Sequence, residues 1–163
     1  MKIADVLLAE YDHEIANTRR LLALVPADKG DWKPHDKSMT LGKLAEHVAR
    51  LPEFGSVVMS TNDLDITTVK FPEWNFTGAD ALISVLDESS ATLKNNVSNL
   101  SDEALQSLWK LRAGDHVMVQ FPKYVAFRVV FMNHLVHHRG QLGVYLRLLD
   151  IPIPGMYGPS ADD

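Results

Sequence analysis

The 163-residue chain contains no cysteine. Disulfide bonds and thiolate metal ligands are therefore excluded, so a bound metal must use histidine, aspartate, glutamate or water. The absence of cysteine also fits a reducing compartment. Long hydrophobic runs are missing too, since the short apolar segment 6–9 is flanked by Asp5, Glu10 and Asp12. This segment is neither a signal peptide nor a membrane span, and we expect a cytoplasmic protein without a membrane partner.

Positive charge is scarce, and the formal net charge is −5. A nucleic-acid partner is not expected, because binding to phosphates requires a basic surface. The sequence also has no glycine-rich phosphate loop, no Ser/His/Asp arrangement, no internal repeat and no linker of low complexity. Its length fits one domain over residues 1–163, with a core of ordinary size.

Hydrophobic periodicity predicts an all-α chain with the architecture of a four-helix bundle. The four amphipathic segments cover about residues 3–25, 40–58, 77–97 and 123–149. Thr40 is expected to cap the second helix, and Pro52 to kink or divide it. The long connection at 61–76 is either a crossover that carries Phe71 and Trp74 onto the bundle, which we favour, or a functional lid. A small hairpin with glycine at its bend is possible at 109–121, before the last helix.

Two histidines, His134 and His138, are four residues apart in the last predicted helix, on its apolar face. A buried imidazole needs a partner, and a divalent metal suits two neutral imidazoles well. His47 lies in the apolar stripe of the second predicted helix. Alone, it would be interpreted as a core histidine with one hydrogen bond. In a bundle, however, facing helices can bring these three rings together.

Three histidine ligands with one open coordination position are typical of a catalytic zinc site. Nickel, iron or manganese also suit such a set, so the metal stays open. The pair is not part of a His-Glu-x-x-His motif, and a protease of that type is not predicted. Gln141 is a candidate for orienting a ligand ring. Tyr145 could reach the site, although packing is its expected role.

Three segments resemble the DinB family of bacterial damage-inducible proteins. They run from Ser38 through His47, from Asn133 through His138 to Leu142, and from Pro154 to Ser160. The resemblance implies a four-helix bundle, often dimeric, with a divalent metal held by three histidines. Carried onto this sequence, these ligands are His47, His134 and His138.

The resemblance also implies a range of activities. Some related proteins are transferases or isomerases that use low-molecular-weight thiols, and many have no known activity. Our first hypothesis is a metal-dependent thiol S-transferase with a small-molecule substrate, a divalent metal cofactor and a homodimeric assembly. The alternatives are a metal-dependent hydrolase that activates water and a non-catalytic metal-binding stress-response protein. No catalytic residue is predicted beyond the metal ligands.

Overall fold

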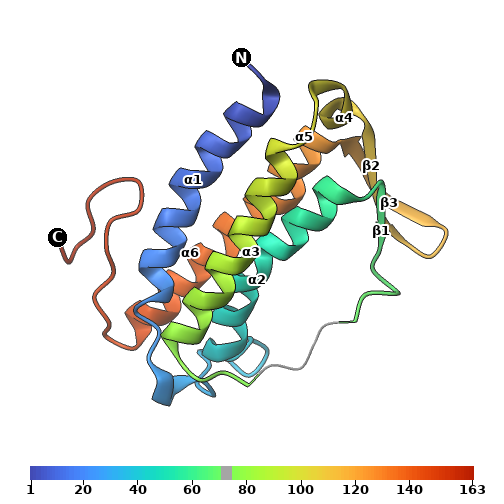
Figure 1. Cartoon of the computed structure of the whole chain (residues 1–163). Helices are drawn as coiled ribbons and strands as arrows, with labels where there is room; N and C mark the ends of the chain where they lie inside the picture. The colour runs from blue at the N-terminus through green and yellow to red at the C-terminus, as the bar shows by residue number, and fades with distance from the viewer. Residues whose placement is uncertain (71–74) are drawn as a thin grey trace.

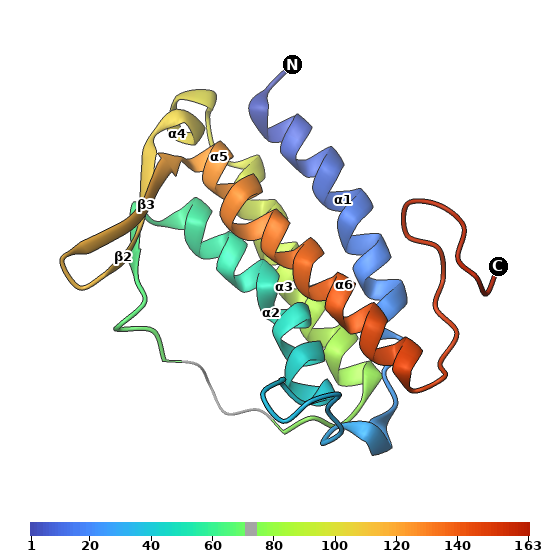
Figure 2. The same cartoon turned by 180° about the vertical axis from the view of Figure 1, so that it is seen from behind.

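The computed structural model describes residues 1–70 and 75–163. Four long helices lie side by side in both views of the molecule (Figures 1 and 2). They are α1 (Ile3–Leu22), α2 (Leu41–Ser60), α3 (Ala79–Ser98) and α6 (Asn133–Leu148). Their apolar faces meet in one main core, in which side chains such as Tyr11, Leu44, Leu93 and Phe131 are fully buried. Within the described residues, no helix is long and apolar enough to cross a bilayer.

The chain is mostly helical, as predicted, but it is not strictly all-α. A small three-stranded sheet has the order β1 (Asp63–Asp65), β2 (Leu108–Ala113) and β3 (His116–Pro122). The predicted hairpin is confirmed, since β2 and β3 pair antiparallel. Gly114 stands at its bend with φ +58°, a conformation that favours glycine. Strand β1 comes from the predicted crossover and pairs parallel with β2.

Ion pairs hold β1 against β2. The Arg112 guanidinium contacts the Asp63 carboxylate at 2.6 Å and the Asp65 carboxylate at 2.7 Å. Asp65 also accepts a hydrogen bond from the Gly114 amide at 3.1 Å, at the turn of the hairpin. The Thr67 hydroxyl and the amides of Gly114 and Thr67 donate hydrogen bonds to the Asp65 carboxylate, and they lower its pKa to about 2. A three-residue strand has no periodicity of its own, which is why the sequence pattern did not reveal it.

The last long helical segment has three parts. It begins with α5 (Lys123–Ala126), continues as a π-helical segment (Phe127–Met132) and ends as α6. A π-helical segment changes the face on which later side chains project, and such segments are often found at functional sites. Here it ends at Met132, two residues before His134. Two shorter helices, the 3₁₀ turn Ala27–Lys29 and α4 (Asp102–Gln106), lie in the connections.

Helix α2 carries the first candidate ligand and begins as expected. The Thr40 hydroxyl accepts a hydrogen bond from the Lys43 amide at 3.4 Å, which confirms the predicted cap. Pro52 lies inside the helix without dividing it. A Cβ added at Gly55 would lie 2.9 Å from the Phe131 ring, so this glycine permits the close approach of α2 to the last helix. Phe71 and Trp74, expected on the crossover, lie outside the described residues.

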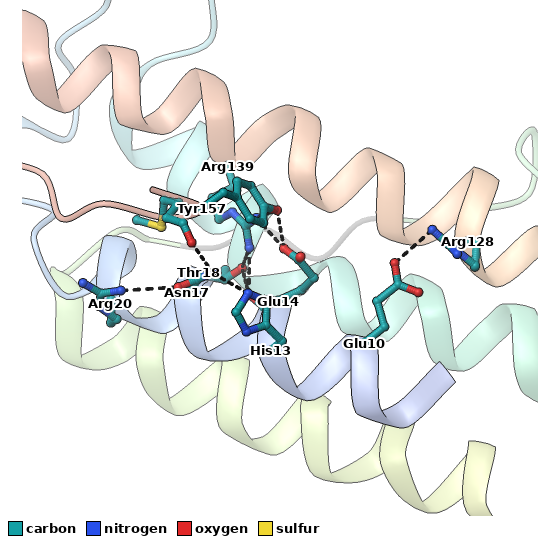
Figure 3. A network of polar contacts seen from close by, with 10 residues as sticks. Glu10, His13, Glu14, Asn17, Thr18, Arg20, Arg128, Arg139 and Tyr157 are labelled. Atoms are coloured by element: carbon teal, nitrogen blue, oxygen red, sulfur yellow. Dashed lines mark hydrogen bonds and ion pairs between the residues drawn. The ribbon is translucent and has the colours of Figure 1, made fainter. Parts of the chain in front are cut away.

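The C-terminal tail docks along α1, as the polar network in Figure 3 shows. The Tyr157 hydroxyl donates to the Glu14 carboxylate at 2.6 Å and contacts the Arg139 guanidinium. The Glu14–Arg139 ion pair is buried between α1 and α6. The Asn17 side-chain amide donates to the Met156 carbonyl at 3.1 Å. The segment from Pro154 to Ser160 is therefore tied to the helices by specific polar contacts.

Candidate metal centre

Three histidines from two helices converge between α2 and α6. The Nε2 atoms of His47 and His134 lie 3.2 Å apart. The His47 ring is centred 4.5 Å from that of His138, and the two rings on α6 are 4.6 Å apart. One nitrogen from each ring can be chosen so that all three lie within 4.8 Å of one another. The three residues predicted from the sequence thus form a group that could hold a metal ion.

The positions of the histidines along the two helices bring their rings together. His134 and His138 are one turn apart on α6, so their side chains project from the same face. Helix α2 presents His47 to that face from the opposite side of the interface. The Phe54 ring, two turns further along α2, meets the His134 ring edge-on with 6.3 Å between centroids. All three histidines are half-buried, so the group has one side in the protein and one side toward solvent.

Burial keeps the three imidazoles neutral. It lowers the pKa of His47 to about 4, and the neighbouring His138 and His134 rings act in the same direction. The pKa values of His134 and His138 are also lowered, again mainly by burial. A neutral imidazole has one nitrogen lone pair available for a metal, whereas an imidazolium has none. At neutral pH this group therefore offers three nitrogen donors.

Gln141 fixes the orientation of one ring. Its side-chain oxygen Oε1 lies 2.7 Å from Nδ1 of His138. Because an amide oxygen only accepts, this contact requires the proton of His138 on Nδ1. The Nε2 lone pair is then free to bind a metal, as is usual for histidine ligands that donate their other N–H. The expectation that Gln141 orients a ligand ring agrees with this contact.

The chemistry of the donor set fits a transition metal. Two nitrogen ligands at the usual zinc distance of about 2.0–2.1 Å in tetrahedral geometry lie about 3.3–3.4 Å apart. The Nε2 separation of 3.2 Å between His47 and His134 is close to this value. Three neutral imidazoles without a carboxylate suit zinc, nickel or iron better than magnesium or calcium. The residues present therefore fit the predicted cofactor class.

The remaining histidines lie outside the group. His137 is exposed and turned away, although its ring centroid is 4.8 Å from that of His138. His13 approaches Asn17 and the Tyr157 ring, on the side of the docked tail. His35 and His116 are exposed in a loop and in β3. None of these four joins the metal-ligand group found among the described residues.

Comparison with known proteins identifies the family. The sequence model of the DinB family matches residues 1–163. The chain belongs to the DinB family. The uncharacterized protein YrdA of Bacillus subtilis (strain 168) is 22% identical over 166 residues, which cover 98% of this chain and 90% of YrdA.

Two solved DinB-like structures have the same fold. The protein from Bacillus cereus ATCC 10987 superposes with a TM-score of 0.69 at 19% identity, covering 93% of this chain and 95% of its own. The YjoA protein of Bacillus subtilis superposes with a TM-score of 0.71 at 18% identity, covering 92% and 96%. At these identities the likeness shows a DinB-like fold.

Sequence reasoning missed the polar network formed by Glu14, Arg139 and Tyr157. Its members are far apart in the sequence and share no period. Lys43, an exposed residue of α2 one turn before His47, was also not singled out, although the spacing of four residues is visible in the sequence.

Proposed function

We propose that this protein is a metal-dependent thiol S-transferase. His47, His134 and His138 would hold a divalent cation, and a small thiol would be the nucleophile. The observation that carries the proposal is the convergence of three neutral imidazole donors on a half-buried position with one side toward solvent. A closed structural site would be expected to surround the metal with a fourth protein ligand instead. The described residues offer no fourth His, Asp or Glu within the group.

The residues of the chain have distinct tasks in this proposal. A bound divalent cation would lower the pKa of a neighbouring thiol, so that a nucleophile is available at neutral pH. The three histidines supply lone pairs because burial keeps them neutral. Gln141 holds the proton of His138 on Nδ1, which keeps Nε2 directed at the cation. The Phe54 ring packs against His134 and would limit the movement of that ring.

The proposed transfer is a substitution and needs no oxidant or reductant. The thiol loses its proton to solvent, and its sulfur forms a bond to an electrophilic carbon. The leaving group departs with the electron pair of the bond that breaks. With no cysteine of its own, the protein must take the sulfur from a cosubstrate. No residue of the chain is assigned as general base.

The test is thiol transfer by metal-loaded protein to 1-chloro-2,4-dinitrobenzene, an aryl chloride whose thioether product absorbs light. We expect turnover that needs metal and thiol together and that is lost in His134→Ala. Lys110→Gln, an exposed substitution in β2, is the control and should keep full activity. Metal-loaded protein that shows no turnover with any of several small thiols would contradict the proposal. Hydrolysis of 4-nitrophenyl acetate without thiol would favour the hydrolase alternative.

The homodimer implied by the family resemblance stays a prediction. Exposed apolar side chains on α6, Val144 and Leu148, are available for such a contact. The molar mass from light scattering of the purified protein tests it directly.

A further inference from the structure

The two helices that carry the histidines are in a fixed register. Helices α2 and α6 run in opposite directions (Figures 1 and 2). The Tyr145 hydroxyl on α6 donates to the Met39 carbonyl just before α2 at 3.3 Å. Two turns away, the His138 ring meets the His47 ring with 4.5 Å between centroids. In antiparallel helices, these two contacts determine which residues face each other between them.

Gln141 and Lys43 occupy the facing positions between those contacts. Gln141 is one turn beyond His138 on α6, and Lys43 is one turn before His47 on α2. Both side chains are exposed, and that of Gln141 contacts the His138 ring. A turn rises about 5.4 Å along the helix. The two side chains therefore flank the same edge of the metal position from opposite helices.

Both side chains present unused hydrogen-bond donors at this edge. Gln141 uses its oxygen for His138, so its amide NH₂ group remains, and it has no acceptor among the described residues. The Lys43 ammonium forms no ion pair or side-chain hydrogen bond in the described part of the chain. It acts on the nearby Glu46 carboxyl only through its electric field. The Glu46 carboxylate is itself bound by Arg50, at 3.4 Å.

We propose that the substrate of this site carries a carboxylate, which is bound by the Lys43 ammonium and the Gln141 amide. This inference rests on the proposed function, because the thiol of the same molecule would meet the metal. An ammonium and an amide NH₂ are donors only, so together they select an anionic acceptor over a neutral or cationic group. Although the chain is acidic as a whole, this edge offers donors to the ligand. The substrate class is a short thiol with a carboxylate about one helical turn from its sulfur.

The test compares two small thiols of similar size that differ in charge. Cobalt-loaded protein is titrated with 3-mercaptopropionate, an anion, and with 2-mercaptoethanol, which is neutral, and the visible spectrum reports binding near the metal. We expect the anion to bind about five- to tenfold more tightly, as a charge-assisted contact at a partly exposed site provides. Lys43→Gln should remove this preference, and raising the salt concentration should reduce it. Lys110→Gln, the charge-matched control on β2, should leave it unchanged.

The outcomes separate the two proposals. If both thiols bind equally to the wild type, or if Lys43→Gln keeps the preference for the anion, the carboxylate site is refuted while thiol binding stands. If neither thiol changes the cobalt spectrum, the thiol-dependent function fails, and the carboxylate site fails with it. Because Lys43 is exposed and forms no contact that the fold needs, its variant should keep the circular dichroism of the wild type.

Discussion

Gln141 and His138 are joined by a hydrogen bond of 2.7 Å between Oε1 and Nδ1. This contact lies within one turn of α6 and determines which nitrogen of His138 carries the proton. The lone pair of Nε2 is then free, in a ring that packs against the rings of His47 and His134. The Gln141 side chain thus determines how the His138 ring is oriented relative to the other two histidines.

Removal of this hydrogen bond should weaken metal binding. We expect Gln141→Leu to reduce the affinity for zinc about 10- to 100-fold, the range found when the hydrogen-bond partner of a histidine ligand is removed. Gln141→Glu keeps an acceptor for Nδ1–H and should retain most of the affinity. Competition with a chromophoric chelator measures both. Equal affinities of wild type and Gln141→Leu would show that the contact does not orient His138.

The metal-free protein should lose stability as the pH falls from about 6.5 to 4. Burial lowers the pKa of His47 to about 4, whereas its usual value is 6.5. Between these two pH values, His47 binds a proton in the unfolded chain but not in the folded chain. Lowering the pH therefore favours unfolding. The melting temperature recorded across the window measures the effect. His47→Gln should have a flatter pH dependence, and an unchanged slope would contradict the assigned pKa shift.

The buried Glu14–Arg139 ion pair should be costly to break on one side only. Arg139→Met leaves the Glu14 carboxylate buried without its guanidinium, and we expect a loss of about 3–5 kcal/mol in the free energy of unfolding. Denaturant unfolding measures the loss. The double variant Glu14→Leu/Arg139→Met removes both charges and should be clearly more stable than Arg139→Met. A double variant as unstable as the sum of its single variants would contradict this coupling.

The tail should loosen when the hydroxyl of Tyr157 is removed. This hydroxyl donates to Glu14 at 2.6 Å, and a hydrogen bond to a charged group contributes about 1.5–3 kcal/mol. Tyr157→Phe should therefore speed hydrogen exchange in residues 150–163 while leaving the metal content unchanged, since the network lies on the α1 side of α6. Exchange at the wild-type rate would mean that the other tail contacts suffice to hold it.

Helical spacing predicted that the three histidines come together, because the signal that it uses is local in the sequence. His134 and His138 are one turn apart, and His47 lies on the apolar stripe of a neighbouring helix, so the packing of amphipathic faces brings them together. The hairpin was found for a similar reason, from alternating residues around Gly114. Metal binding at this group stays a prediction.

The features that were missed depend on contacts between distant parts of the chain. Strand β1 pairs with β2, and its Asp63 and Asp65 contact Arg112, more than 40 residues away. The pairing of Glu14 with Arg139 bridges 125 positions. Such partners leave no periodic signal in a single sequence. The sequence pattern indicated the hairpin of β2 and β3 but not β1, because a three-residue strand forms only through tertiary contacts.

The central claim is that His47, His134 and His138 bind a divalent metal. The most direct test is the metal content of untagged protein, measured by plasma mass spectrometry for the wild type and for His134→Ala side by side. We predict nearly one equivalent of zinc, nickel, iron or manganese in the wild type and almost none in the variant. A wild type that holds no metal, even after reconstitution with each of these ions, would contradict the account.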